Sequence, residues 1–254
     1  MMLPLSRRPK RWQLAQKHQR ANQLQKKAML IHADAKSFKI SRLGYAASLF
    51  KMISQFRVMN DDTKILEVGS GPHGASLFWP KGFVVALDPL ACFYRKEFGF
   101  IQDETDALLC QGMGEHLPFP SAVFDCVISD NVLDHTTDAA GILKEIHRIL
   151  KDDGLFLLSV NVHHMIYRAF SLLFDMLFTI HIIPRAPNYK THTHFFTPSL
   201  IMRLLTRNDF RIAYSNMRPD NKHRSYSLSR LKPYKNRYST IVCFKSGKYL
   251  LNEV

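Results

Sequence analysis

Short apolar runs separated by polar segments occupy the middle of the chain. Each run is rich in Val, Ile, Leu and Phe, as expected for strands that are buried on both faces of a sheet. The segments between them have the length of crossover connections. We therefore predict an α/β fold with a mostly parallel sheet covered by helices on both faces. The predicted strands lie near residues 64–68, 83–88, 107–111, 124–129 and 154–161.

Helical periodicity precedes this region. Leu, Ala, Met, Ile and Phe recur at spacings of three and four in residues 11–30 and 44–57, and no proline interrupts either stretch. We predict an N-terminal helical cap over residues 1–60, followed by one domain over residues 61–254. At 254 residues and 46% hydrophobic content, the chain is large enough to bury one such α/β core.

The C-terminal third predicts one more helix and two more strands. Thr197 is a suitable N-cap and Pro198 suits a first helical turn, so a helix is expected through about residue 207. Strands near 210–216 and 238–246 would complete a sheet of seven strands. Residues 217–237 between them are expected to form a basic loop before the last strand.

A glycine-rich turn follows the first predicted strand. Gly69, Gly71 and Gly74 satisfy G-x-G-x-x-G, a spacing that lets the backbone turn tightly and approach a ligand. Asp88 ends the second strand, so its carboxylate would reach the same sheet edge and accept hydrogen bonds from two ribose hydroxyls. The pattern predicts a site for a nucleoside cofactor.

Three neighbouring features favour a cofactor other than NAD. Glu67 lies inside the first strand, Pro72 and His73 stiffen and crowd the loop, and the site begins only after residue 60. The Glu67-x-Gly69-x-Gly71 segment resembles motif I of the class I S-adenosylmethionine-dependent methyltransferases.

Further segments resemble the type 11 (UbiE-like) branch of that family, in the same order along the chain. They include an LPFP segment, an FDxV strand, a VLxH segment, a helix and turn similar to E-x-x-R-x-LKPGG, and an FTP tail. Together with motif I they cover residues 64 to about 216. The resemblance implies a Rossmann-like sheet of seven strands, S-adenosyl-L-methionine as cofactor, and methyl transfer. The segments are Gly112–Pro120, Phe124–Ile128, Asn131–His135, Glu145–Leu157 and His194–Phe210.

The resemblance also implies a set of residues around the cofactor. The glycine loop would line its methionine part, the acid after the second strand would hold its ribose, and the following apolar residues would contact adenine. Glu67 would be held by loop amides or would address the cofactor's ammonium group. The set is Glu67, Gly69, Ser70, Gly71, Gly74, Asp88, Pro89, Leu90, Gly114, Glu115, Asp130 and Asn131. One departure is Met113, where many relatives carry an aspartate that binds the adenine amino group.

Catalytic residues are harder to assign, because transfer from a sulfonium depends mainly on positioning. A general base is required only for a poorly nucleophilic acceptor. His163 and His164 follow the fifth strand, His194 precedes the C-terminal helix, and His135 follows a family pattern. These four are candidates for proton transfer, with a purely structural role as the alternative for each. No metal site is expected, since the four cysteines are scattered without a C-x-x-C pair.

Charge is distributed unevenly around this site. Residues 1–60 hold 13 Lys and Arg against one acid, residues 61–160 hold 7 against 16, and residues 161–254 hold 15 against 4. The respective net charges are +12, −9 and +11. Two basic flanks around an acidic core suggest an anionic partner, which could be RNA, an anionic membrane surface or an acidic small substrate. The alternative is that the basic residues only solvate the surface.

Residues 165–183 are dense in Leu, Ile, Phe and Met but contain Arg168, Asp175 and His181. A charge near the centre of a bilayer costs about 2.5 to 3.5 kcal/mol, so we do not predict a transmembrane span. As a helix, the segment would form a substrate lid, a patch for peripheral membrane contact, or an ordinary core helix.

These observations predict an S-adenosylmethionine-dependent methyltransferase with a small or lipid-linked acceptor. One alternative is an RNA methyltransferase that docks through the basic flanks; a scaffold that binds the cofactor without turnover is another. The N-terminus has no continuous apolar segment typical of a secretion signal, and the cysteine pattern favours a reducing compartment. We expect a cytoplasmic protein, with contact to a membrane surface as an option. The sequence leaves the acceptor and the oligomeric state open.

Overall fold

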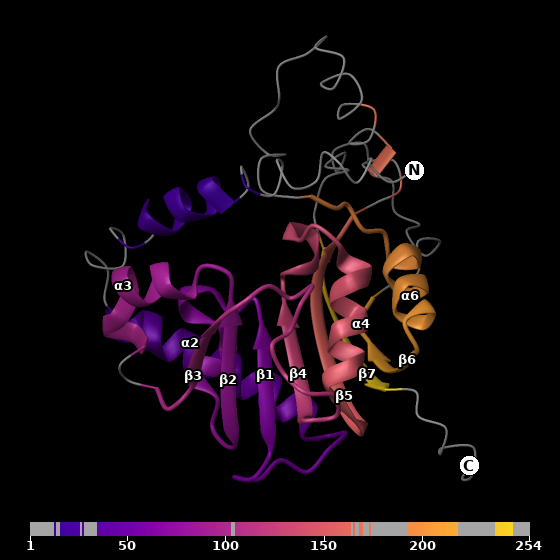
Figure 1. The fold of residues 1–254 in the computed structure, drawn as a ribbon, viewed down its shortest axis with the longest axis horizontal. Coiled ribbons are helices and arrows are strands. Elements are labelled where there is room, and N and C mark those ends of the chain that lie inside the picture. Colours follow the sequence, from indigo (N-terminus) through magenta and orange to yellow (C-terminus); the bar gives the residue numbers. More distant parts are fainter. Residues whose placement is uncertain are drawn as a thin grey trace, which may run out of the picture.

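A computed structural model describes most of the central part of the chain and several shorter stretches. The described residues are 13, 16–25, 27, 35–102, 105–163, 165, 168, 169, 173, 193–217 and 237–245. Their strands form one sheet of seven, in the order β3-β2-β1-β4-β5-β7-β6 (Figure 1). The α/β architecture predicted from the sequence is confirmed.

The first five strands of the sheet are parallel, and β7 pairs antiparallel with both β5 and β6. All seven predicted strands are present, and the first two have the predicted bounds. The fifth begins at Leu150 instead of residue 154, because Leu150 pairs with Phe124 at the start of β4. The strands are β1 Lys64–Val68, β2 Phe83–Asp88, β3 Leu108–Gln111, β4 Phe124–Asp130, β5 Leu150–Val162, β6 Phe210–Ser215 and β7 Arg237–Lys245.

Helices cover both faces of this sheet. Residues 16–25 are helical as well, within the predicted 11–30 stretch. The expected bounds of the second helix, 44–57, are wrong, because α2 begins at Ala35 and ends at Ile53. Its first part exposes Lys39 and Ile40, so the apolar periodicity that marks its buried face is not visible there. The labelled helices are α2 Ala35–Ile53, α3 Ala91–Gln102, α4 Ala139–Ile149 and α6 Pro198–Arg207.

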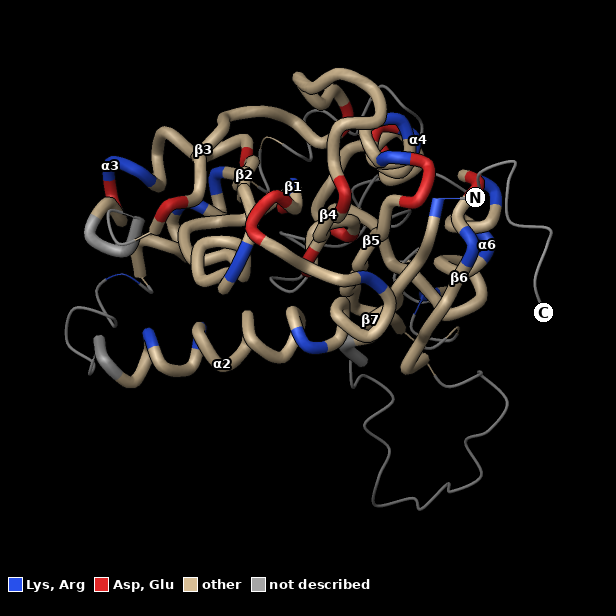
Figure 2. The backbone as a smooth tube through the Cα atoms, turned by 90° about the horizontal axis from the view of Figure 1, so that it is seen from below, with Lys and Arg blue, Asp and Glu red and all other residues tan. Residues whose placement is uncertain are grey.

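Two apolar cores lie on opposite faces of the sheet. On one face, α4 and α6 pack against the strands through residues such as Ile142 and Ile201. On the other face, α2 runs across the sheet and buries Ala46, Leu49 and Ile53 (Figure 2). Successive side chains of β1 point to opposite faces of the sheet, so Leu66 packs in the first core and Ile65 in the second.

The start of α6 confirms the predicted cap. The Thr197 side chain accepts a hydrogen bond from the Leu200 backbone N at 3.3 Å, and Pro198 occupies the first turn. No helix among the described residues is long and apolar enough to cross a membrane. Most of the 165–183 segment and nearly all of the predicted basic loop at 217–237 lie outside the described residues.

The LPFP segment is fastened to α4 by two side chains of the E-x-x-R motif. Arg148 donates to the carbonyl oxygens of Phe119 at 2.7 Å and Leu117 at 3.0 Å. Glu145 accepts from the Leu117 backbone N at 2.9 Å and pairs with Arg148 at 2.8 Å. The motif therefore holds the segment that leads from β3 to β4.

We expect Arg148→Met to lower the free energy of unfolding by about 1 to 3 kcal/mol, because two carbonyl groups lose a charged donor. Urea unfolding followed by circular dichroism measures this. Arg203→Met on the exposed side of α6 is the matched control and should leave stability nearly unchanged. Equal midpoints for the two variants would contradict the role assigned to Arg148.

Candidate cofactor site

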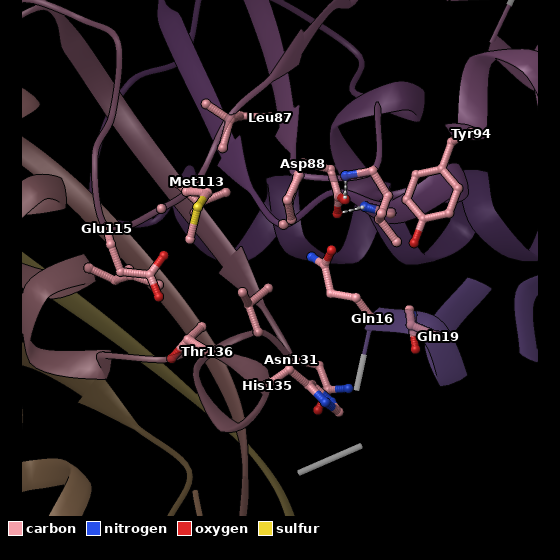
Figure 3. Close-up of a pocket in the computed structure, with 18 residues that line it drawn as sticks. Gln16, Gln19, Leu87, Asp88, Tyr94, Met113, Glu115, Asn131, His135 and Thr136 are labelled. Carbon is pink, nitrogen blue, oxygen red and sulfur yellow. Dashed lines mark hydrogen bonds between the residues drawn. The ribbon is translucent and has the colours of Figure 1, made fainter. Parts of the chain in front are cut away.

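A cavity lies at the carboxyl ends of the parallel strands β1, β2 and β4 (Figure 3). This edge is where open α/β sheets bind ligands. Segments that are distant in sequence meet there: the 16–25 helix, the loop after β1, the end of β2, the loop after β3 and the loop after β4. The lining residues are Gln16, Gln19, Val68, Gly69, Gly71, Leu87, Asp88, Pro89, Leu90, Tyr94, Met113, Gly114, Glu115, Asn131, Val132, His135, Thr136 and Ile142.

The loop after β1 turns through two glycines in the left-handed region, Gly69 at φ +78° and Gly71 at φ +61°. The Gly69 backbone N donates to the Leu87 carbonyl at 2.7 Å, which fixes the turn against β2. A Cβ atom at position 69 would overlap the side chain of Val132, whereas a Cβ at position 71 would meet no atom within 4 Å. The glycine loop thus forms a close-fitting backbone wall with open space beside Gly71.

Glu67 holds this loop from behind. Its carboxylate accepts hydrogen bonds from the backbone N atoms of Ala75 at 3.1 Å and Ser76 at 2.9 Å, and from the Ser76 hydroxyl. A Cβ at Gly74 would overlap Glu67 Oε2, so a glycine is required there. Burial raises the pKa of the Glu67 carboxyl to about 7, although these hydrogen bonds oppose the rise. Of the two roles predicted for Glu67, the structure shows the binding of loop amides.

Asp88 connects the glycine loop to the end of β2. Its Oδ2 accepts from the Gly71 backbone N at 3.0 Å and its Oδ1 accepts from the Leu90 backbone N at 2.8 Å. Each oxygen keeps a further lone pair, and the carboxyl group faces the cavity (Figure 3). Burial raises the pKa of this carboxyl to about 6, again against the effect of its hydrogen bonds.

Apolar groups form the wall beside Asp88. Pro89, Leu90 and Met113 line it. Gly114 lets the chain approach closely, because a Cβ there would lie 2.9 Å from Ile142 Cδ1 and 3.0 Å from Val68 Cγ1. This wall can bury a flat apolar group next to a carboxylate.

Glu115 lines the cavity and also braces the loop before α4. Its Oε1 accepts from the Thr137 hydroxyl at 2.6 Å and from the Thr137 backbone N at 3.0 Å. One carboxylate oxygen is thereby engaged within the protein. Glu115, one of the residues expected around the cofactor, thus lines the cavity with a carboxylate whose orientation is set by Thr137.

Asn131 lines the cavity at the end of β4, and neighbouring Asp130 lies outside the lining. Asn131 has φ +60°, and its side-chain oxygen accepts from the Asn161 amide. Asp130 accepts from the Tyr45 hydroxyl at 2.9 Å, which ties α2 to the end of β4. Burial raises the pKa of the Asp130 carboxyl, and Tyr45 and Arg42 oppose the rise. Glu67, Ser70 and Gly74 also lie outside the lining.

The four candidate histidines are not all placed alike. His135 lines the cavity, with its Nε2 3.7 Å from Asp134 Oδ1. His163 packs edge-on against Phe195, and His194 stacks on Phe196; neither lines this cavity. His164 lies outside the described residues. Within the described part of the chain, no group of three His, Cys, Asp or Glu side chains could hold a metal ion.

Sequence reasoning missed several residues of the cavity wall. Val132 lies within the Asn131–His135 motif and Thr136 directly follows it, but the motif alone does not show which side chains turn inward. Gln16, Gln19 and Tyr94 come from two helices that meet over the site. The spacing of the glutamines on one helical face is the signal in the sequence that could have identified them.

Comparison with known proteins identifies the central region. The family described as "Methyltransferase domain" matches residues 66–158. This region is similar to methyltransferases of the type 11 family. Over 164 residues it is 27% identical to malonyl-[acyl-carrier protein] O-methyltransferase of Geobacter sulfurreducens, covering 59% of this chain and 57% of that protein. It is 31% identical over 101 residues to the uncharacterized methyltransferase YcgJ of Bacillus subtilis, covering 37% and 39%. The chain therefore spans about half the length of these relatives.

Solved structures show the same fold. The crystal structure of YcgJ matches with a TM-score of 0.52 at 21% identity, covering 69% of this chain and 71% of that one. An S-adenosylmethionine-dependent methyltransferase from Methanosarcina mazei matches with a TM-score of 0.54 at 16% identity, covering 76% and 96%. At these identities the likeness concerns the fold alone. S-Adenosylmethionine is the cofactor of this methyltransferase family.

Proposed function

We propose that this protein transfers a methyl group from S-adenosylmethionine to a small or lipid-linked acceptor, and that the described cavity binds the cofactor. One observation carries the proposal. Gly69, Gly71 and Asp88 form a cradle in which two left-handed glycines and a buried carboxylate face the same space. Such a cradle suits a ligand with a polar chain and a ribose diol.

The remaining wall fits the other parts of the cofactor. The loop of Gly69, Ser70 and Gly71 would run along the methionine part, and Asp88 would accept hydrogen bonds from the ribose hydroxyls. The apolar wall of Pro89, Leu90, Met113 and Gly114 would hold adenine. Met113 cannot accept a hydrogen bond from the adenine amino group as a carboxylate would, so apolar contact dominates at this point.

The chemistry requires little from the protein beyond orientation. The cofactor supplies an activated methyl group on a sulfonium with a good leaving group. The chain's task is to hold the acceptor in line and exclude water, and such positioning can contribute about 7 to 11 kcal/mol. His135 is the one candidate histidine that lines the described cavity, and it would accept the proton of a poorly nucleophilic acceptor.

A direct assay of methyl transfer is necessary because this fold also supports other reactions. The [4+2]-cyclase SpnF has a similar fold, with a TM-score of 0.53 at 13% identity. The basic flanks, with net charges of +12 and +11, favour RNA as a second acceptor class. A scaffold that binds cofactor without turnover is the third alternative.

The test incubates purified protein with methyl-labelled S-adenosylmethionine and cell extract, alongside the Asp88→Ala variant. Label is then counted in lipid, small-molecule, RNA and protein fractions. Label that enters the lipid or small-molecule fraction only with the native chain supports the proposal. Label in RNA would replace the proposed acceptor with the second one. Cofactor binding without Asp88-dependent label in any fraction would favour the scaffold.

Cofactor affinity is expected to fall below about pH 6, because the pKa of Asp88 is raised to about 6. Hydrogen bonds from ribose favour the ionised carboxylate, so affinity is full above this pKa and is lost as the pH falls through it. The expected loss is about tenfold per pH unit below 6. Calorimetric titration with S-adenosylhomocysteine between pH 5 and 8 measures it. Asp88→Asn should bind weakly and without this dependence; an unchanged profile would assign the titration to Glu67 instead.

A further inference from the structure

The helix over residues 16–25 turns its polar side toward the protein. Gln16, Gln19 and Gln23 lie on one helical face at spacings of three and four residues. Gln16 and Gln19 line the cavity, and Gln23 is only 6% exposed, whereas Leu24 is 43% exposed. A helix that packs against a core normally does the reverse. We call Gln16, Gln19 and Gln23 the glutamine face.

Burying carboxamides is unfavourable unless they find hydrogen-bond partners. Gln19 has one, the Tyr94 hydroxyl on α3. The Gln23 Oε1 atom is buried and has no partner among the described residues. Gln16 extends into the cavity toward Asp88 (Figure 3). The glutamine face therefore offers hydrogen-bonding groups that the described residues do not fully satisfy.

Other side chains hold this helix in place. Lys27 pairs with Glu97 of α3 at 3.1 Å, and its ammonium lies 5.8 Å from the centre of the Phe98 ring. The Arg20 guanidinium lies 5.5 Å from the centre of the Phe93 ring. The Arg20 contact joins the helix to α3, and the Lys27 contacts join α3 to a residue just beyond the helix. The side-chain amide of Gln16 makes none of these contacts. Holding the helix against α3 therefore does not require a glutamine at position 16.

We propose that the glutamine face belongs to the cofactor site and that Gln16 holds the ribose hydroxyls from the side opposite Asp88. The inference rests on the proposed function. Asp88 already accepts from two backbone N atoms, and it can only accept. A carboxamide can both donate to a hydroxyl oxygen and accept from a hydroxyl proton, so Gln16 complements Asp88. The glutamine face lies outside the matched residues 66–158, so it is a feature that the family match does not cover.

The test measures dissociation constants of the full chain for two probes. One is S-adenosylhomocysteine; the other is its analogue without the two ribose hydroxyls. Gln16→Ala should bind S-adenosylhomocysteine about fivefold more weakly and the analogue as well as the native chain does, since one hydrogen bond is lost. Gln25→Ala, at an exposed position of the same helix, is the matched control and should change neither constant.

A second variant separates binding from packing. Gln16→Leu should retain or raise the thermal midpoint of the free protein, because it buries apolar surface, while it weakens S-adenosylhomocysteine binding to a similar extent. The inference alone is overturned if the native chain binds and Gln16→Ala behaves like Gln25→Ala. Equal weakening of both probes by Gln16→Ala would also overturn it, because the ribose contact would then be absent. If the native chain binds neither probe, the proposed function fails together with this inference.

Discussion

Gly69→Ala is expected to abolish detectable binding of S-adenosylhomocysteine and to lower the free energy of unfolding by about 2 to 4 kcal/mol. Two costs combine at this position. An alanine at φ +78° is strained, and its Cβ would overlap the Val132 side chain. Relief of that overlap would displace the glycine loop or the start of the β4 loop, and both line the cavity. Calorimetric titration and urea unfolding measure the two effects.

Gly71→Ala provides a matched control for this prediction. Gly71 also has a positive φ, of +61°, but a Cβ there would meet no atom within 4 Å. Only the backbone strain should remain, so the expected loss of stability is about 1 to 2 kcal/mol. Adding Val132→Ala to Gly69→Ala should restore part of the stability, because it removes the atoms that overlap. Equal destabilisation by both glycine variants, without rescue, would show that the overlap is unimportant.

Asp88→Ala is expected to weaken S-adenosylhomocysteine binding by about tenfold or more, because hydrogen bonds to a charged group contribute about 1.5 to 3 kcal/mol. The variant also leaves the Gly71 and Leu90 backbone N atoms without their acceptor. Calorimetric titration at pH 7.5 measures the affinity, and the rate of label transfer should fall in parallel at limiting cofactor.

Glu67→Gln is the informative comparison for Asp88→Ala. It alters a buried carboxylate that binds the same loop but lies outside the cavity lining. Its main expected effect is on stability, through the Ala75 and Ser76 amides. If Asp88→Ala bound the cofactor as tightly as the native chain does, while Glu67→Gln lost affinity, the ribose assignment would be wrong.

The sheet and the glycine loop were predictable because their determinants are local. β1 and β2 are short, mostly apolar runs, with Glu67 inside the first and Asp88 at the end of the second, and Gly69 and Gly71 mark the turn between them by composition alone. The start of α2 was not predictable in this way, because its first turns expose both Lys39 and Ile40 and show no apolar face.

Features of the site that depend on tertiary contacts could not be predicted from the sequence. The bond between Tyr45 and Asp130 joins residues 85 positions apart. The inward orientation of Gln16 depends on contacts between helix 16–25 and α3, such as Arg20 with the Phe93 ring. A glutamine on a helix is ordinarily solvated, and only the assembled structure shows which face the neighbouring helix covers.

The sheet order has a consequence for how the chain can be assembled during translation. β7 follows β6 in the chain but lies between β5 and β6, so β6 has no strand to pair with until residues 237–245 have been synthesised. Until then β5 presents an open edge of unpaired backbone groups, buried later by eight residue pairs with β7. A nascent chain stalled before β7 therefore carries, along β5, a template for pairing with other chains.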